Sequence, residues 1–199
     1  EAEVRRSASA AAWRTRQERV LQILRAEMLG PFPERTPLRP RVTGIVRQAG
    51  YRVEKIVYES VPGLHVTAAL FVPDAAPQPA AAILFASGHT ADAFRNRDPG
   101  SSYLWMILNL VRKGFIVFAF DPLSQGERAQ YFDASKGVSR LGKASAQHGY
   151  MGLPPQLTRY SLAQAMTWDG IRAIDYIETR PEVDRRRLGM FGTSGGGTQ

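Results

Sequence analysis

The chain has 199 residues, 44% of them hydrophobic, which is long enough for one sizeable core. Its net charge of +8 comes from scattered basic residues that do not interleave with aromatic ones, which argues against nucleic-acid binding. The absence of cysteine excludes disulfides and thiolate metal sites, and no apolar run of about 18 residues predicts a membrane span. The composition therefore indicates one domain with an additional arm.

Residues 1–48 are predicted to form this arm, a helix followed by a linker. Over about residues 8–29, apolar side chains recur at helical spacing, which predicts an amphipathic helix docking on the body. A membrane-surface helix with a basic face is the less favoured alternative. The Gly-Pro-Phe-Pro run at 30–33 ends the helix, and prolines keep the chain extended to Pro40. Residues 49–199 are then the domain proper.

The domain begins with two strand-like runs, at residues 51–60 and 64–72. A Val-Pro-Gly sequence joins them, which is typical of a tight turn. These features predict an antiparallel hairpin at the edge of a sheet.

Strands and helices alternate after the hairpin. Residues 80–86 are almost continuously apolar, which is typical of a strand buried on both faces. A helix centred on residues 104–111 and a second buried strand at 115–120 follow. This order predicts an α/β protein with a mostly parallel sheet.

An insertion without clear periodicity covers residues 124–159. Long insertions after a strand usually lie over the carboxyl ends of the sheet, where ligands bind. A helix over about 162–177 and a strand at 188–191 restore the alternation.

The last strand leads into Gly192-Thr193-Ser194-Gly195-Gly196, which fits G-x-S-x-G. In α/β-hydrolases this pattern forms a strand-to-helix turn that exposes a nucleophilic serine. Gly192 and Gly196 would allow the close approach of strand and helix that such a strained turn requires. Ser194 is therefore the candidate nucleophile, with a plain glycine-rich turn as the alternative.

A serine nucleophile also needs hydrogen-bond donors for the developing oxyanion. The first expected donor is the backbone N–H of Gly195, and the second is that of His89, in the loop after strand 80–86. Gly88 either supports this loop or merely makes its turn. Asp121, at the end of the next strand, is expected to hold the neighbouring loops by accepting backbone hydrogen bonds.

Other polar residues are assigned structural roles. Glu127 and Arg128 are expected to pair with each other, and a surface position is favoured for His148 over one that reaches the site. No metal-ligand spacing or phosphate-binding loop occurs in the sequence, so neither metal nor cofactor is expected. Three helical residues at three-residue spacing are expected to form salt bridges: Asp169, Arg172 and Asp175.

The order of catalytic residues in α/β-hydrolases is serine, acid, histidine. Only five residues follow Ser194, and the three histidines (His65, His89 and His148) all precede it. The acid and histidine of a triad are therefore expected beyond Gln199, in the remainder of the domain.

Five segments together resemble the acetyl xylan esterase-like α/β-hydrolases, which are related to cephalosporin C deacetylases and dienelactone hydrolases. The likeness covers nearly the whole chain and is specific in combination. The segments are residues 29–38 (LGPFPERTPL), 121–128 (DPLSQGER), 168–176 (WDGIRAIDY), 180–184 (RPEVD) and 192–199 (GTSGGGTQ).

The resemblance implies a serine esterase, often bacterial, that acts on acetylated sugars or other small esters without a cofactor. It would place Ser194 as the nucleophile, with Gly195 and His89 in the oxyanion hole. A peptidase of the prolyl-oligopeptidase type and an inert structural or binding module are the alternatives. The sequence does not indicate a compartment.

Overall fold

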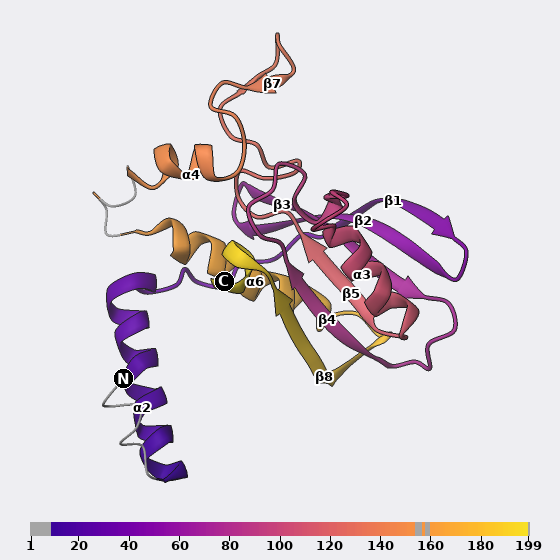
Figure 1. Ribbon diagram of the computed structural model, residues 1–199, viewed down its shortest axis with the longest axis horizontal. Coiled ribbons are helices and arrows are strands. Elements are labelled where there is room, and N and C mark those ends of the chain that lie inside the picture. The colour runs from indigo at the N-terminus through magenta and orange to yellow at the C-terminus, as the bar shows by residue number, and fades with distance from the viewer. Residues whose placement is uncertain (1–8, 154–156, 158–159, 199) are drawn as a thin grey trace.

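The computed structural model describes residues 9–153, 157 and 160–198, and its centre is a six-stranded sheet (Figure 1). The strand order is β1-β2-β3-β5-β4-β8. Strands β1, β2, β3 and β5 pair antiparallel in turn, whereas β4 pairs parallel with both β5 and β8. The predicted α/β class and its antiparallel hairpin are confirmed. The strands are β1 (Arg41–Gln48), β2 (Tyr51–Val61), β3 (Leu64–Pro73), β4 (Ala80–Ala86), β5 (Ile116–Phe120) and β8 (Val183–Gly192).

Strand β1 forms the sheet edge in a segment where the sequence analysis places only a linker. The sheet thus begins at Arg41, and the hairpin β2–β3 lies one strand in from the edge. The pairing register of β1 shifts between Val42 and Gly44, and none of its residues is buried. A strand with an interrupted register and no buried face lacks the alternation that marks a strand in a sequence.

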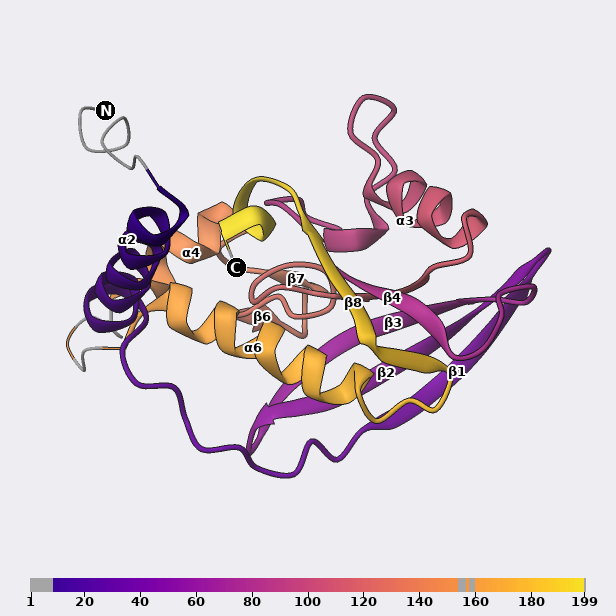
Figure 2. The same cartoon turned by 90° about the horizontal axis from the view of Figure 1, so that it is seen from below.

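Helices α3 (Tyr103–Arg112) and α6 (Leu162–Ile177) cover opposite faces of the sheet (Figure 2). Each has a serine cap, and α6 has a full capping box between Ser161 and Gln164. Alternate residues of β5 serve the two faces, because Phe118 packs with the α6 residues and Val117 with the α3 residues. The core therefore has two apolar layers on either side of one sheet.

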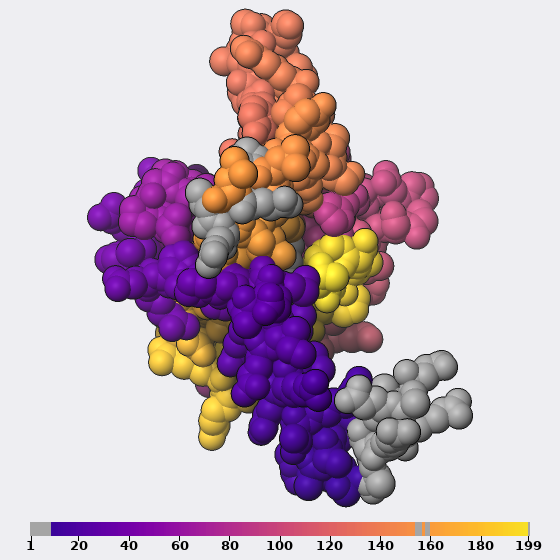
Figure 3. All heavy atoms as spheres, turned by 90° about the vertical axis from the view of Figure 1, so that its left-hand side faces the viewer, coloured from indigo at the N-terminus to yellow at the C-terminus, as the bar shows by residue number. Residues whose placement is uncertain are grey.

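Helix α2 (Ala10–Ile23) and the π-helical turn η1 (Leu24–Leu29) form the arm, but α2 does not dock as expected. None of the residues of α2 is buried, and Trp13 remains 45% exposed. Figures 1 and 3 show the helix projecting away from the body. The end of η1 is attached to the body through a 2.6 Å hydrogen bond from Ser161 Oγ to the Met28 carbonyl. The predicted start near residue 8 lies outside the described residues.

The insertion leaves the carboxyl end of β5 and carries more structure than its sequence suggests. It contains a small hairpin of β6 (Phe132–Asp133) and β7 (Val138–Ser139), followed by helix α4 (Ser145–Met151). The hairpin extends from the body at the top of Figure 1. The predicted end of the insertion, residue 159, is not among the described residues. A 3₁₀ turn in each of two loops completes the description: η2 (Ala93–Arg95) and η3 (Ser194–Thr198).

Candidate active site

Strand β8 ends in a tight turn that carries Ser194. The backbone of Ser194 has φ 53°, a left-handed conformation that is uncommon for a residue other than glycine. A Cβ atom on Gly192 would lie 2.4 Å from the Gly196 carbonyl oxygen, and one on Gly196 would lie 2.0 Å from the Ala86 carbonyl oxygen. Both positions therefore require glycine, which gives G-x-S-x-G a steric reason in this chain.

The loop after β4 lies directly against this turn, because β4 and β8 are parallel neighbours with Ala86 opposite Gly192. A Cβ on Gly88 would lie 2.8 Å from the Thr193 carbonyl oxygen and 3.1 Å from Ser194 Cβ. The imidazole of His89 covers Gly195, whose added Cβ would lie 2.2 Å from His89 Cε1. The structure thus brings the four residues Gly88, His89, Ser194 and Gly195 together; the oxyanion roles of the two backbone N–H groups stay a prediction.

His148 lies beside this group, although the sequence analysis favoured a surface position. Its Nδ1 is 3.1 Å from His89 Nε2, and its Nε2 is 2.8 Å from the Leu123 carbonyl oxygen. Burial lowers the pKa of His148; the hydrogen bond to Leu123 opposes this effect and the proximity of His89 adds to it, with a downward net shift. The lowered pKa therefore favours the neutral form of His148 at pH 7. The two histidines are 59 positions apart, and no sequence pattern relates them.

Asp121 is completely buried at the carboxyl end of β5. Its carboxylate accepts hydrogen bonds from Thr67 Oγ1 at 2.6 Å and from the backbone N–H of Glu127 at 3.2 Å. Arg95 Nη1 forms a 2.6 Å ion pair with the same carboxylate. Asp121 thus holds the start of the insertion against β3 and against the turn that bears Arg95.

Gln125 is a site-supporting residue that the sequence analysis missed. Its buried side chain donates a 2.8 Å hydrogen bond to the Gly88 carbonyl oxygen. The next residue, Gly126, has φ +57° and donates its N–H to the Ala91 carbonyl oxygen at 2.9 Å. The segment after β5 therefore holds the His89 loop from both sides. The one sequence feature that could have indicated this role is the position of Gln125 shortly after the end of the apolar strand β5.

Glu127 and Arg128 do not pair with each other as expected. Glu127 lies in a turn that the Arg128 N–H closes by donating to the Gln125 carbonyl oxygen at 2.9 Å, and the side chains of Glu127 and Arg128 leave this turn toward different partners. Arg128 accordingly forms a buried 2.6 Å ion pair with Asp169 of α6, whereas Glu127 forms an exposed pair with Arg95 at 3.0 Å. We call Asp121, Arg128 and Asp169 the loop anchor, since Arg128 Nη1 also donates to the Asp121 carbonyl oxygen at 3.0 Å.

The expected salt bridges within α6 form only in part. Arg172 pairs with Asp175 at 2.6 Å, while Asp169 turns to Arg128 instead. The third histidine of the chain, His65, lies near Glu59 on strand β2.

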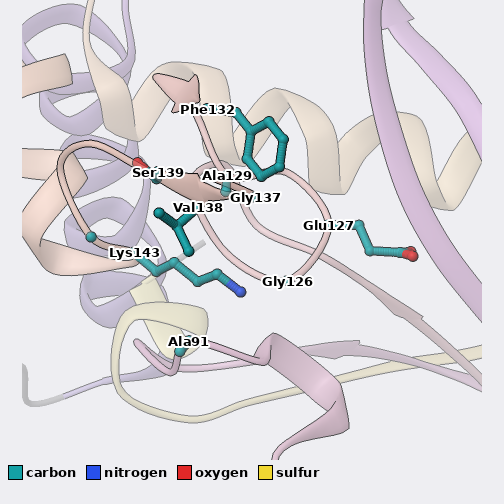
Figure 4. Close-up of a pocket in the computed structure, with 10 residues that line it drawn as sticks. Ala91, Gly126, Glu127, Ala129, Phe132, Gly137, Val138, Ser139 and Lys143 are labelled. Atoms are coloured by element: carbon teal, nitrogen blue, oxygen red, sulfur yellow. The ribbon is translucent and has the colours of Figure 1, made fainter. Parts of the chain in front are cut away.

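A pocket of about 740 Å³ opens beside the His89 loop, between Ala91 and the β6–β7 hairpin. Figure 4 shows Phe132, Val138 and Lys143 around this space, with the Glu127 carboxylate pointing away from it. Phe132 is 58% exposed, and Lys143 forms no ion pair with any described residue. The pocket therefore combines an exposed aromatic ring with an available cation.

Within the described residues, no hydrogen bond joins the side chain of Ser194 to a histidine or a carboxylate. The same part of the chain contains no group of three or more His, Cys, Asp or Glu residues that could hold a metal ion. It also contains no helix long and apolar enough to cross a membrane.

The arrangement of sheet, helices and serine turn is that of an α/β-hydrolase. A model of the Abhydrolase family matches residues 3–168. The chain belongs to this family. The matched segment includes His89, Asp121 and His148, and Ser194 follows it. A search of curated proteins gives no match.

Solved structures share this fold. A Bacteroides fragilis protein provisionally assigned as an acetyl xylan esterase matches with a TM-score of 0.73 and 19% identity, over 94% of this chain and 49% of that one. Acetyl xylan esterase 1 from a Thermoanaerobacterium species matches with a TM-score of 0.58 and 24% identity, over 89% of this chain and 56% of that one. A glucuronoyl esterase from Solibacter usitatus matches with a TM-score of 0.55 and 21% identity, over 94% of this chain and 54% of that one. The chain thus spans about half the length of these proteins.

Proposed function

We propose that Ser194 is the nucleophile of an esterase that cleaves carboxylic esters through an acyl-enzyme intermediate. The observation that carries the proposal is the strained, glycine-enclosed turn that presents Ser194 beside the His89 loop. Strained backbone is retained where the surrounding structure enforces it, and it clusters at active sites.

The proposed reaction has two steps. Ser194 Oγ bonds to the ester carbonyl carbon, the C=O electron pair moves onto the carbonyl oxygen, and the serine proton passes to a base. The electron pair then returns, the bond to the alcohol oxygen breaks, and the alcohol leaves with the proton. Water attacks the acyl-enzyme in the same way and releases the acid. The backbone N–H groups of Gly195 and His89 would stabilise the oxyanion in both steps.

The base and its acid partner are also part of the proposal. In the order typical of this fold they follow the serine. We therefore expect them in the portion of the fold that the structural relatives have and this chain does not span.

For the substrate, we propose acetyl esters of carbohydrates or similar small esters. The names of the structural relatives support this class, because they include acetyl xylan esterases and a glucuronoyl esterase.

Labelling with a fluorophosphonate tests the nucleophile directly. The protein at its natural length should gain one adduct by intact mass, and it should hydrolyse acetyl esters faster than amides. Ser194→Ala should abolish the adduct and lower kcat for ester hydrolysis by at least roughly 10⁴-fold. The matched control is Ser101→Ala, at an exposed serine outside the site, which should label like the wild type.

Two results would reject the proposal. One is an unchanged adduct on Ser194→Ala, and the other is retention of most ester hydrolysis by that variant. Faster cleavage of prolyl amides than of acetyl esters would instead favour a peptidase.

A further inference from the structure

The Leu123 carbonyl, His148 and His89 form a chain of hydrogen bonds whose direction is fixed. A carbonyl oxygen only accepts, so the 2.8 Å contact requires a proton on His148 Nε2. Burial keeps this imidazole neutral, so its Nδ1 has no proton and can only accept. The 3.1 Å contact with His89 is then a donation from His89 Nε2–H to His148 Nδ1.

The direction of this chain sets the tautomer of His89. In the tautomer of His89 with its proton on Nε2, the Nδ1 atom carries an unshared lone pair. Cε1 and Nδ1 are the ring atoms nearest to Gly195, because a Cβ there would lie 2.2 Å from Cε1 and 2.5 Å from Nδ1. His89 is exposed, and its Nδ1 has no hydrogen-bond partner among the described residues. An acceptor is therefore available next to the residue that follows the proposed nucleophile.

The chemistry of His89 Nδ1 limits which groups of a bound ester it can contact. In this tautomer His89 cannot donate from Nδ1 to an oxyanion, so that task falls to backbone N–H groups. On a carbohydrate ester, the hydroxyl groups are donors that Nδ1 can accept from. An ester of a sugar carries such a hydroxyl on the carbon next to the one that bears the ester oxygen, whereas an ester of a simple alcohol does not.

We propose that His148 is a positioning residue that fixes the tautomer of His89, and that His89 Nδ1 accepts a hydrogen bond from a free hydroxyl on the alcohol part of the ester. The substrate class is then the esters of polyhydroxylated alcohols with a hydroxyl next to the ester. This inference rests on the proposed esterase function and adds a selection rule to it.

A pair of substrates tests the selection rule. The protein at its natural length should cleave a 2-O-acetylated methyl xyloside with a kcat/KM about fivefold to tenfold higher than its 3-deoxy analogue, the ratio expected for one hydrogen bond. His148→Leu should bring this ratio close to one, mainly by lowering kcat/KM for the hydroxylated ester. His148→Asn is the matched variant, because its amide oxygen offers His89 an acceptor again, and it should retain most of the preference.

A spectroscopic measurement separates tautomer control from a general structural effect. In ¹⁵N-labelled protein, His89 should show a protonated Nε2 and an unprotonated Nδ1, and His148→Leu should produce a mixture of the two tautomers. A proton on Nδ1 in the wild type, or no preference between the two esters, would overturn the inference.

The two proposals fail in different ways. An adduct on Ser194 without any preference for the hydroxylated ester would overturn only the role of His89. Absence of both the adduct and ester cleavage would reject the proposed function and, with it, the hydroxyl recognition, while the ¹⁵N spectrum would still decide the tautomer.

Discussion

The loop anchor and the Ser194 turn lie on either side of the His89 loop, and their polar groups differ in burial and pairing. In the anchor, the side chains of Asp121, Arg128 and Asp169 are at most 3% exposed, and each forms an ion pair: Arg128 with Asp169, and Asp121 with Arg95. At the turn, His89 is exposed and one of its ring nitrogens has no partner among the described residues. Buried, paired groups hold geometry, whereas exposed, unpaired groups remain available to a substrate.

This difference predicts that substitutions in the two regions affect different measured properties. A change in the anchor should lower the free energy of unfolding, and activity should fall only as far as the loops move. A change at the turn should remove labelling of the serine at a smaller cost in stability. Three substitutions test this separation, in order of decreasing effect on stability.

The largest loss is expected from Arg128→Met, which leaves the buried Asp169 carboxylate without its partner. Removing one member of a buried ion pair typically costs about 3–5 kcal/mol. Urea unfolding monitored by circular dichroism would measure it. Arg39→Ala breaks an exposed pair with Glu59 and should cost less than about 1 kcal/mol.

The double variant Arg128→Met/Asp169→Leu sharpens this test. Both Arg128 and Asp169 have buried side-chain atoms without a hydrogen-bond partner in the described structure, so the pair is imperfectly satisfied. Replacing both charges by apolar groups should recover most of the lost stability. If the double variant is no more stable than Arg128→Met, an unpaired charge is not the cause of the loss.

An intermediate loss of stability is expected from Gly196→Ala, which changes a residue of the Ser194 turn. The new Cβ would lie 2.0 Å from the Ala86 carbonyl oxygen, so β4 and β8 must separate or the turn must rearrange. Forced overpacking costs about 1–3 kcal/mol. Fluorophosphonate labelling of Ser194 should be lost even in the fraction that remains folded.

The matched control for this substitution is Gly100→Ala. An added Cβ at Gly100 has no atom within 4 Å, so both stability and labelling should be unchanged. Labelling of Gly196→Ala at the wild-type rate would show that the close approach of the two strands is not needed to present the serine.

The elements that sequence analysis predicts are those whose signals are local. The hairpin β2–β3, the apolar strands β4 and β5, and helices α3 and α6 all have the periodicity or turn residues of their type. Strand β1 lacks a buried face and was missed. The apolar side of α2 predicts a helix but not whether it has a partner, and in the structure that side remains exposed.

In the candidate site, too, the features with local sequence signals were predicted and the long-range contacts were not. The pattern around Ser194 and the loop with His89 follow from short motifs and from the parallel order of β4 and β8. The contacts of Gln125 with Gly88 and of Arg128 with Asp169 join residues 37 and 41 positions apart. Such pairs depend on how the insertion folds back, and nothing local in the sequence encodes their register.

The smallest effect is expected at the opposite end of β8, where Glu182 precedes the strand. Burial on its own would raise the pKa of Glu182, but hydrogen bonds and ion pairs with Arg180 and Arg52 outweigh it, and the net pKa is lowered. A lowered pKa in the folded state stabilises the protein above the pKa of the unfolded state. This stabilisation is lost as the pH falls through the folded-state pKa.

Glu182→Gln should therefore be less stable than the wild type at pH 7, by about 1 kcal/mol, because the Glu182 side chain is only 7% exposed but its partners Arg180 and Arg52 are partly exposed. The difference should shrink as the pH falls below about 4.5, because the Glu182 carboxylate then becomes protonated, first in the unfolded wild type and at lower pH in the folded wild type. Urea unfolding of both proteins between pH 3 and pH 7 measures it, with Glu34→Gln as the control at an exposed glutamate without an ion pair among the described residues. Labelling of Ser194 should not change at pH 7, since Glu182 lies at the far end of the strand from the turn. A difference that is as large at pH 3 as at pH 7 would mean that Glu182 stabilises the fold through packing and not through its charge.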